Sequence, residues 1–322
     1  MITERTVVFQ GLRLIGIVTI VAAHAGLSLV GGGNWCTFFF VLSGFLFHDS
    51  IGTVQEYGQY LWRKASRLYP IYWFILALYL LLAVVRGCEQ QYTLHWDFIA
   101  HFLLIQTWLP GIDPMAYLAV AWFLSALLFC YLVAPLIYKI VDKSKYAILL
   151  FISVIITFYA FNANGYLSPL FRLCEYAIGM LLFRWLCKGK KQRKEPFAGL
   201  ILLVLISLLT LMRYGVPYWS NIPLFALLIY GVYMFQSDIL RRILGNRFIV
   251  WLSKSDMVIY LTHAGIGFHL VYYFLSFHAA IATLGSIVIG VVIRLSFEWI
   301  QRMMEKWILS LQPQEYKNHQ EK

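Results

Sequence analysis

Long apolar runs follow one another along the chain and are separated by short polar stretches. An apolar helix of about 20 residues crosses the hydrocarbon core of a bilayer, and the period-two alternation of membrane β-strands is absent. The sequence therefore predicts an all-α integral membrane protein. Its ten expected transmembrane helices cover 11–30, 35–51, 70–85, 118–138, 147–163, 169–187, 196–213, 221–236, 257–276 and 279–299.

One further apolar run, 98–109, is too short to be counted with these. Its twelve residues reach about 18 Å as a helix, against a hydrocarbon core of about 30 Å. Counting it as a span would also place the lysines of 139–145 outside the cell. We expect a re-entrant or interfacial helix here.

The charged residues fix the expected orientation. The 322 residues are 61% hydrophobic and only 13% charged, the mean hydropathy is +0.72, and the net charge is +11. The basic residues gather in short loops at 63–67, 184–194 and 241–254, which the positive-inside rule places in the cytoplasm together with both termini. Such loops contact anionic headgroups of the bilayer, so the positive charge does not indicate a nucleic-acid partner.

The chain has no internal repeat or linker, so we expect one transmembrane domain over 1–300 and a charged cytoplasmic tail over 301–322. The N-terminal run also imitates a secretory signal around 23–25, but the polytopic remainder argues against cleavage. Five cysteines lack the paired spacing of a metal or disulfide site, and no metal is expected. They are Cys36, Cys88, Cys130, Cys174 and Cys187.

Arg13 and His24 both lie in the first apolar run, eleven residues apart. This spacing puts them on one helical face, about 16 Å from each other. Cationic and titratable side chains in a membrane span usually face a protein interior or a substrate path. We interpret this helix as the wall of an active site, with His24 as the catalytic group. The alternative is that Arg13 snorkels to the headgroups and His24 bonds to a neighbouring helix.

Glu175 lies at a depth similar to that of His24, so it is expected to orient the imidazole as a catalytic partner. Arg172 on the same helix is a candidate for binding the substrate. The alternative is an ion pair between Arg172 and Glu175, which are three residues apart, with a purely structural role.

A second group of basic residues is expected at the cytoplasmic side, where its charge suits the phosphates of a soluble donor. The alternative is that these residues only obey the positive-inside rule. The sequence contains no Walker loop, GxGxxG, HExxH or GxSxG motif. The donor-binding candidates are Arg13, Arg63, Lys64, Arg67 and His263.

Six stretches in this order resemble the membrane-bound acyltransferase type 3 family, bacterial enzymes that place short acyl groups on cell-surface sugars. The resemblance extends from about residue 10 to 299. The stretches are LRLIGIVTIVAAH at 12–24, FFFVLSGFLF at 38–47, RKASRLYPIYW at 63–73, WFLSALLFCYLVAPLI at 122–137, RLCEYAIGML at 172–181 and WLSKSDMVIYLTH at 251–263.

This resemblance implies that Arg13 and His24 are the essential pair of the first span. It makes Lys64 and Arg67 the basic-x-x-basic element of the first cytoplasmic loop. Two positions depart from the family pattern: Lys64 stands where arginine is usual, and Ala126 lies near a position that often holds glutamate.

The function implied is transfer of an acyl group, in the first place acetyl, from cytoplasmic acyl-CoA to a hydroxyl of a glycan or lipid-linked sugar. The setting would be the bacterial plasma membrane, and a separate extracytoplasmic partner could complete the pathway. Whether His24 acts as a base or carries the acyl group stays open. A transporter or flippase of a glycan is the alternative function, whereas a structural scaffold would leave Arg13 and His24 unexplained.

Overall fold

A computed structural model describes most of the chain. The ranges described are 7–27, 32–47, 56–87, 96–143, 146–147, 151–152, 154–156, 165–191, 193–194, 221–274 and 278–311. The expected span 196–213, most of the expected span 147–163 and the tail beyond 311 lie outside the described residues.

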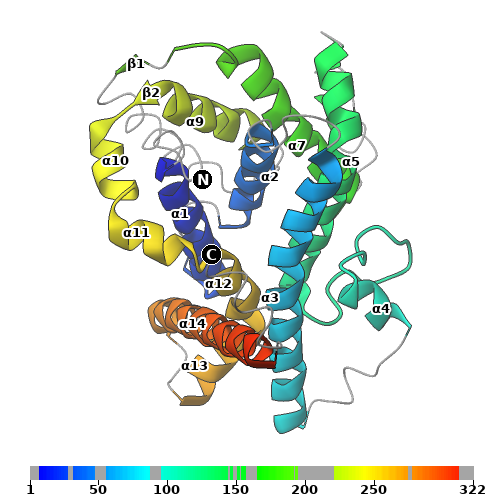
Figure 1. Cartoon of the computed structure of the whole chain (residues 1–322), viewed down its shortest axis with the longest axis vertical. Coiled ribbons are helices and arrows are strands. Elements are labelled where there is room, and N and C mark those ends of the chain that lie inside the picture. Colours follow the sequence, from blue (N-terminus) through cyan, green and yellow to red (C-terminus); the bar gives the residue numbers. More distant parts are fainter. Residues whose placement is uncertain are drawn as a thin grey trace.

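Within these ranges the chain is almost entirely helical, as predicted (Figure 1). The α-helices are α1 (Val7–His24), α2 (Trp35–Phe45), α3 (Tyr57–Val85), α4 (Asp97–Phe102), α5 (Trp122–Lys143), α7 (Pro169–Leu182), α9 (Ile222–Met234), α10 (Asp238–Leu244), α11 (Arg247–Ser253), α12 (Asp256–Thr262), α13 (Phe268–Phe274) and α14 (Ala279–Leu311). Short 3₁₀ turns cover Gly32–Asn34 and Ala119–Ala121, and π-helical turns cover Phe183–Cys187 and His263–Gly267. Two-residue strands, β1 (Arg193–Lys194) and β2 (Phe235–Gln236), pair in parallel.

Four helices in the described ranges are long and apolar enough to cross a membrane: Val7–His24, Tyr57–Val85, Ala119–Asp142 and Ala279–Trp307. Other expected spans consist of shorter pieces joined end to end. The span expected over 169–187 is α7 followed by a π-helical turn that ends at Cys187. The short helix expected over 98–109 is α4, whose six residues rise only about 9 Å.

The helix α3 begins well before the expected span. We expected the span to start at Pro70, with a loop before it, but α3 starts at Tyr57 and continues through Pro70. A proline in a helix interior removes one backbone hydrogen bond, which membrane helices tolerate when neighbouring helices pack around the site. The basic element of the expected loop, Lys64 and Arg67, is therefore helical, and its two side chains lie on one face of α3.

The first helix ends earlier than its apolar run suggests. After His24, the amide of Gly26 donates to the carbonyl oxygen of Ala23, and that of Leu27 donates to the carbonyl oxygen of Ala22. Gly26 has a φ of 94°, so these bonds form a Schellman motif with glycine in the left-handed position. His24 is thus the last residue of α1 and is exposed, whereas we expected it to lie well inside a span.

The helices α2 and α7 cross with their backbones in close contact. A Cβ at Gly44 would overlap the carbonyl oxygen of Tyr176, and a Cβ at Gly179 would overlap that of Val41. Small residues at such crossings are typical of membrane helix packing. This crossing places α2 between α1 and α7 (Figure 1).

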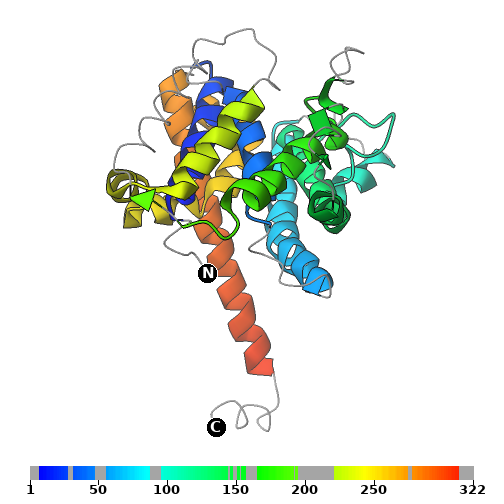
Figure 2. The ribbon, with the colours of Figure 1, turned by 90° about the horizontal axis from the view of Figure 1, so that it is seen from above.

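The last helix extends beyond the body of the protein. The C-terminal half of α14 projects away from the other helices (Figure 2) and continues to Leu311, past the expected end at 299. Its exposed large apolar side chains near this end are Trp299, Met303, Met304 and Trp307.

Candidate active site

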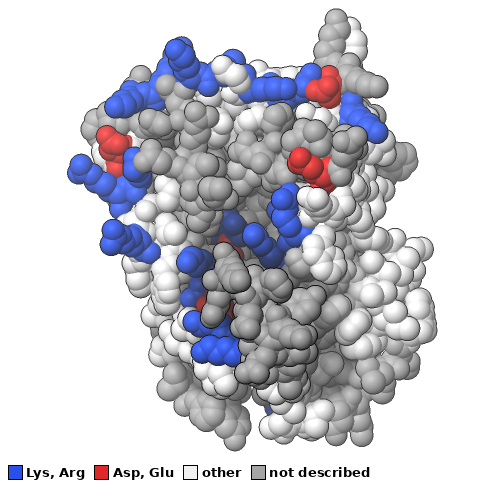
Figure 3. Space-filling model, in the orientation of Figure 1, with Lys and Arg blue, Asp and Glu red and all other residues white. Residues whose placement is uncertain are grey.

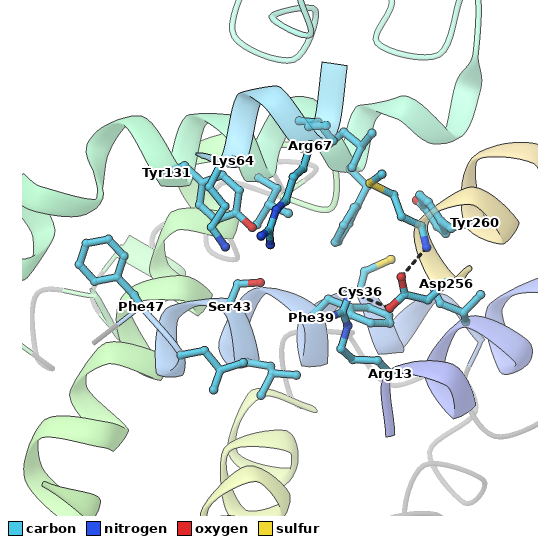
Figure 4. A pocket seen from close by; sticks show the side chains of 18 of the residues that line it. Arg13, Cys36, Phe39, Ser43, Phe47, Lys64, Arg67, Tyr131, Asp256 and Tyr260 are labelled. Carbon is cyan, nitrogen blue, oxygen red and sulfur yellow. Dashed lines mark hydrogen bonds and ion pairs between the residues drawn. The ribbon is translucent and has the colours of Figure 1, made fainter. Parts of the chain in front are cut away.

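A cavity of about 300 Å³ opens between α1, α2, α3, α5 and α12 (Figure 4). This volume is at the lower end of the range for ligand pockets, so it suits the reactive arm of a substrate better than a whole nucleotide. The lining residues are Arg13, Ile17, Cys36, Phe39, Leu42, Ser43, Leu46, Phe47, Tyr60, Lys64, Arg67, Leu68, Phe123, Leu124, Leu127, Tyr131, Asp256, Met257 and Tyr260.

Basic side chains stand at one end of this cavity. Lys64 and Arg67 point from α3 into the space above α2, toward the side where Ser43 also points (Figure 4). The ammonium of Lys64 lies 4.9 Å from the ring centre of Tyr131 and 5.4 Å from that of Tyr60. On the face shown in Figure 3, Lys and Arg side chains surround a central hollow and continue along the edge of the molecule. Arg63 is exposed and does not line the cavity.

Arg13 is held at the cavity wall by a carboxylate that the sequence analysis did not include. Its Nη2 lies 2.6 Å from Oδ2 of Asp256, and the two side chains are 37% and 7% exposed. Asp256 directly precedes the apolar residues of its expected span, 257–276, and acidic residues outside the spans were not among our candidates. This ion pair fixes the guanidinium beside the cavity and leaves part of it accessible.

The other end of the cavity is closed by aromatic rings. On α2 the cavity runs from Cys36 to Ser43, a rise of about 10 Å, and its lining continues to Phe47 in the turn that follows the helix. At the Cys36 end, the ring of Phe123 packs 6.0 Å from that of Phe39 and 5.4 Å from that of Tyr260. The cavity is therefore elongated, with cations near its Phe47 end and aromatic side chains at the end near Cys36.

His24 lies beyond the aromatic end and does not line the cavity. Its Nδ1 is 2.7 Å from Nε2 of His263, and the two rings lie nearly in one plane with their centres 5.0 Å apart. His263 is fully buried, and its ring centre is 5.7 Å from that of Tyr260. The pair thus begins where the cavity ends.

The position of His263 corrects our expectation. We placed it toward the cytoplasmic side with the donor-binding group, yet it lies beside the C-terminal residue of α1. The reason is the course of α12: Asp256 meets Arg13, and seven residues later His263 meets His24, so α12 follows α1 in the same direction. The structure brings Arg13, Lys64 and Arg67 together and leaves His263 outside that group.

Glu175 is also not where we expected it. Both of its oxygens accept hydrogen bonds from Nη1 of Arg172, at 2.9 and 2.7 Å, and Oε1 accepts another from the Thr37 hydroxyl at 2.8 Å. Arg172 donates from Nε to the carbonyl oxygen of Tyr166 at 2.9 Å. Arg172 and Glu175 are both fully buried. The alternative of an intrahelical ion pair is confirmed, and the predicted contact between Glu175 and His24 is replaced by these bonds.

Comparison with known protein families shows a match over most of the chain. Residues 8–300 match the family model described as an acyltransferase domain, of the acyltransferase 3 family. No curated protein and no solved structure matches the chain. The matched range contains every residue that lines the cavity as well as His24 and His263.

Proposed function

The chain belongs to the acyltransferase 3 family of multi-pass membrane acyltransferases, and from this premise we propose the donor, the acceptor and the roles of the residues. The donor is cytoplasmic acyl-CoA, in the first place acetyl-CoA. The acceptor is a hydroxyl group of a cell-surface or lipid-linked glycan at the plasma membrane of a bacterium. The observation that carries this proposal is the elongated cavity with a cationic end and an apolar interior.

The cationic end suits the phosphate groups of the donor. Arginine and lysine bind phosphate strongly; Lys64 and Arg67 stand here on α3, and Arg13 lies further along the wall of the same cavity. Arg13 is part of the cavity wall, so it is placed either to bind a phosphate or to polarise the thioester carbonyl. The leucine and phenylalanine side chains beyond them provide an apolar channel for the arm that carries the thioester.

His24 is proposed as the general base that takes the proton of the acceptor hydroxyl. It is exposed at the end of α1, where an acceptor outside the membrane could reach it. Ile17 is the last residue of α1 that lines the cavity, and the seven residues from there to His24 rise about 10 Å. Tyr260 fills part of this interval, so the donor arm reaches His24 only when the ring of Tyr260 moves aside.

The glycan transporter considered from the sequence receives no support from the family match, which is to acyltransferases. Arg172 and Glu175, which the sequence analysis named as candidates for substrate binding and catalysis, have a structural role under this proposal. They stabilise the packing of α7 against α2 and do not touch substrate.

The test is acyl transfer by the purified protein in lipid nanodiscs with radiolabelled acetyl-CoA. The double variant Lys64→Gln/Arg67→Gln should raise the KM for acetyl-CoA at least tenfold, because it removes two charges from the cavity. Arg63→Gln is the matched control: it removes a neighbouring charge that does not line the cavity, so its KM should stay within twofold of wild type. Equal effects of the two changes would contradict the assignment of the donor site.

His24→Ala should abolish transfer without reducing the amount of folded protein. The acceptor is to be identified in cells, by mass spectrometry of surface glycans from a strain that lacks the gene. Loss of one acyl mass from a glycan, restored by the wild-type gene and not by His24→Ala, would establish both the acceptor class and the group transferred. Glycans that are unchanged by the deletion would contradict the proposed acceptor.

A further inference from the structure

A chain of two hydrogen bonds links the candidate base to the backbone of α12. Nδ1 of His24 lies 2.7 Å from Nε2 of His263, and Nδ1 of His263 lies 2.6 Å from the carbonyl oxygen of Tyr260. His263 is fully buried, whereas His24 is exposed. The second ring nitrogen of His24, Nε2, makes no hydrogen bond to the part of the chain that the structure describes.

The direction of these bonds follows from the carbonyl group. A carbonyl oxygen only accepts hydrogen bonds, so Nδ1 of His263 carries a proton and donates it. A neutral imidazole carries one proton, and Nε2 of His263 is therefore an acceptor. His24 must then donate from its Nδ1, which leaves its Nε2 without a proton.

We infer that His263 is a positioning residue: through its hydrogen bond it selects the tautomer of His24 in which Nε2 is the free base and fixes the orientation of the ring. This inference rests on the proposed function, in which His24 takes the acceptor proton. In many hydrolytic sites a carboxylate fixes the tautomer of the catalytic histidine. Here a second imidazole, itself oriented by a backbone carbonyl group, has that place.

The local fold supports the assignment. His263 begins a π-helical turn, His263–Gly267, and such turns insert an extra residue that rotates the side chains of a helix. The turn packs closely, because a Cβ at Gly265 would overlap the ring of Tyr79 and a Cβ at Gly267 would overlap Ser286. The two imidazole planes differ by only 11° and the ring centres are 5.0 Å apart, so the rings lie nearly in one plane, edge to edge, as the hydrogen bond between them requires.

The tautomer of His24 defines each proton transfer in the movement of the acyl group from the CoA thioester to the acceptor hydroxyl. Nε2 of His24 takes the proton of the acceptor hydroxyl while the hydroxyl oxygen attacks the thioester carbonyl carbon. The carbon–oxygen bond forms and the carbon–sulfur bond breaks. The imidazolium returns the proton from Nε2 to the leaving thiolate, giving the ester and free CoA thiol. His263 keeps its own proton on Nδ1 throughout and accepts the Nδ1 hydrogen bond of His24.

The decisive measurement is the ¹⁵N NMR spectrum of histidine-labelled protein in lipid at a pH of about 8. The chain has eight histidines, and His24 is identified by the signals that are lost in His24→Gln. We expect protonated Nδ1 and unprotonated Nε2 for His24 in the wild type. In His263→Leu this preference should be lost, since leucine accepts no hydrogen bond. A wild-type spectrum with the proton of His24 on Nε2 would overturn the inference.

Kinetics provide the second readout. His263→Leu should lower kcat about 100-fold, the lower end of what general base catalysis contributes. The KM for acetyl-CoA should stay within twofold, because His263 does not line the cavity. His263→Gln should recover at least tenfold of the loss, since its amide oxygen can accept the bond from His24. His101→Gln is the control, because His101 is equally buried and bonds to the carbonyl oxygen of Asp113.

The two hypotheses fail in different ways. If His24 proves essential but carries its proton on Nε2, the role of His263 is wrong and the proposed function stands. If the tautomer is as expected but His24→Ala transfers acyl groups normally, the proposed use of His24 is wrong, and the role of His263 is wrong with it. An unchanged kcat in His263→Leu would also refute the role of His263. If the leucine variant does not fold, the test rests on the wild-type ¹⁵N spectrum and on the kcat of His263→Gln.

Discussion

The buried ion pair between Arg172 and Glu175 separates a structural role from a catalytic one. In Glu175→Ala the guanidinium of Arg172 loses its charge partner in a site that is fully buried. Removing one member of a buried ion pair costs about 3–5 kcal/mol. The Thr37 hydroxyl, which donates to Glu175, also loses its acceptor. We therefore expect Glu175→Ala to be strongly destabilised and to yield little folded protein.

Two further variants divide this loss of stability between the hydrogen bond to Thr37 and the ion pair with Arg172. Thr37→Val removes the 2.8 Å hydrogen bond to Glu175 and the longer one, 3.4 Å, that Thr37 accepts from Arg172, and should cost about 1.5–3 kcal/mol. The double variant Arg172→Met/Glu175→Met removes both charges and keeps a similar volume, and such replacements are often neutral or stabilising. It also loses the contacts of the guanidinium with the rings of Tyr166 and Phe40, at 4.8 and 5.2 Å, so we expect only partial recovery.

The assay is thermal stability in detergent, followed by size-exclusion chromatography, together with acyl transfer per folded molecule. A structural role predicts that stability falls in the order wild type, Thr37→Val and Glu175→Ala. It also predicts that whatever remains folded transfers acyl groups at the normal rate. A Glu175→Ala protein that is as stable as the wild type but inactive would refute this reasoning and restore Glu175 as a catalytic residue.

Three further predictions concern the backbone and the cavity. Gly179→Val should separate α2 from α7, because its side chain would meet the carbonyl oxygen of Val41, and the thermal stability of the detergent-solubilised protein should fall sharply. Gly26→Ala should cost about 1–2 kcal/mol in the same assay, because its φ of 94° is left-handed, whereas Gly58→Ala inside α3, where a Cβ meets no atom within 4 Å, should cost nothing. In a variant that keeps only Cys36 of the cysteines, CoA should slow alkylation of the thiol by a small reagent, measured by mass spectrometry; equal rates with and without CoA would contradict donor binding at this end of the cavity.

Much of the helical layout could be predicted from hydropathy and charge alone. Long apolar segments bounded by turn residues gave useful boundaries: α9 covers Ile222–Met234 against an expected 221–236, and a continuous helical run covers 256–274 against an expected 257–276. This works because the bilayer leaves helices as the main way to satisfy backbone polar groups.

The candidate site was harder to predict, because its residues come together through helix pairing. Depth along a span places Glu175 near the level of His24, but depth does not say which faces of two helices meet. Hydropathy also places Asp256 at a boundary, with no signal that it would pair with Arg13. The π-helical turn that sets the orientation of His263 has no pattern in a single sequence. Residues whose roles depend on such pairing need a structure.

The separation between the cavity beside Arg13 and the imidazole of His24 has a chemical reason under the proposed function. Arg13 and His24 lie on the same helix, with the cavity beside the former and a pair of hydrogen-bonded imidazoles at the latter. If the cavity were open as far as His24, water from outside would meet the thioester, and hydrolysis would compete with transfer. Tyr260 lines the cavity and its ring centre is 5.7 Å from that of His263, so under the proposed function this ring separates the donor from His24. Transfer then requires the ring to move only when a donor fills the cavity, so hydrolysis is avoided at the expense of a conformational step.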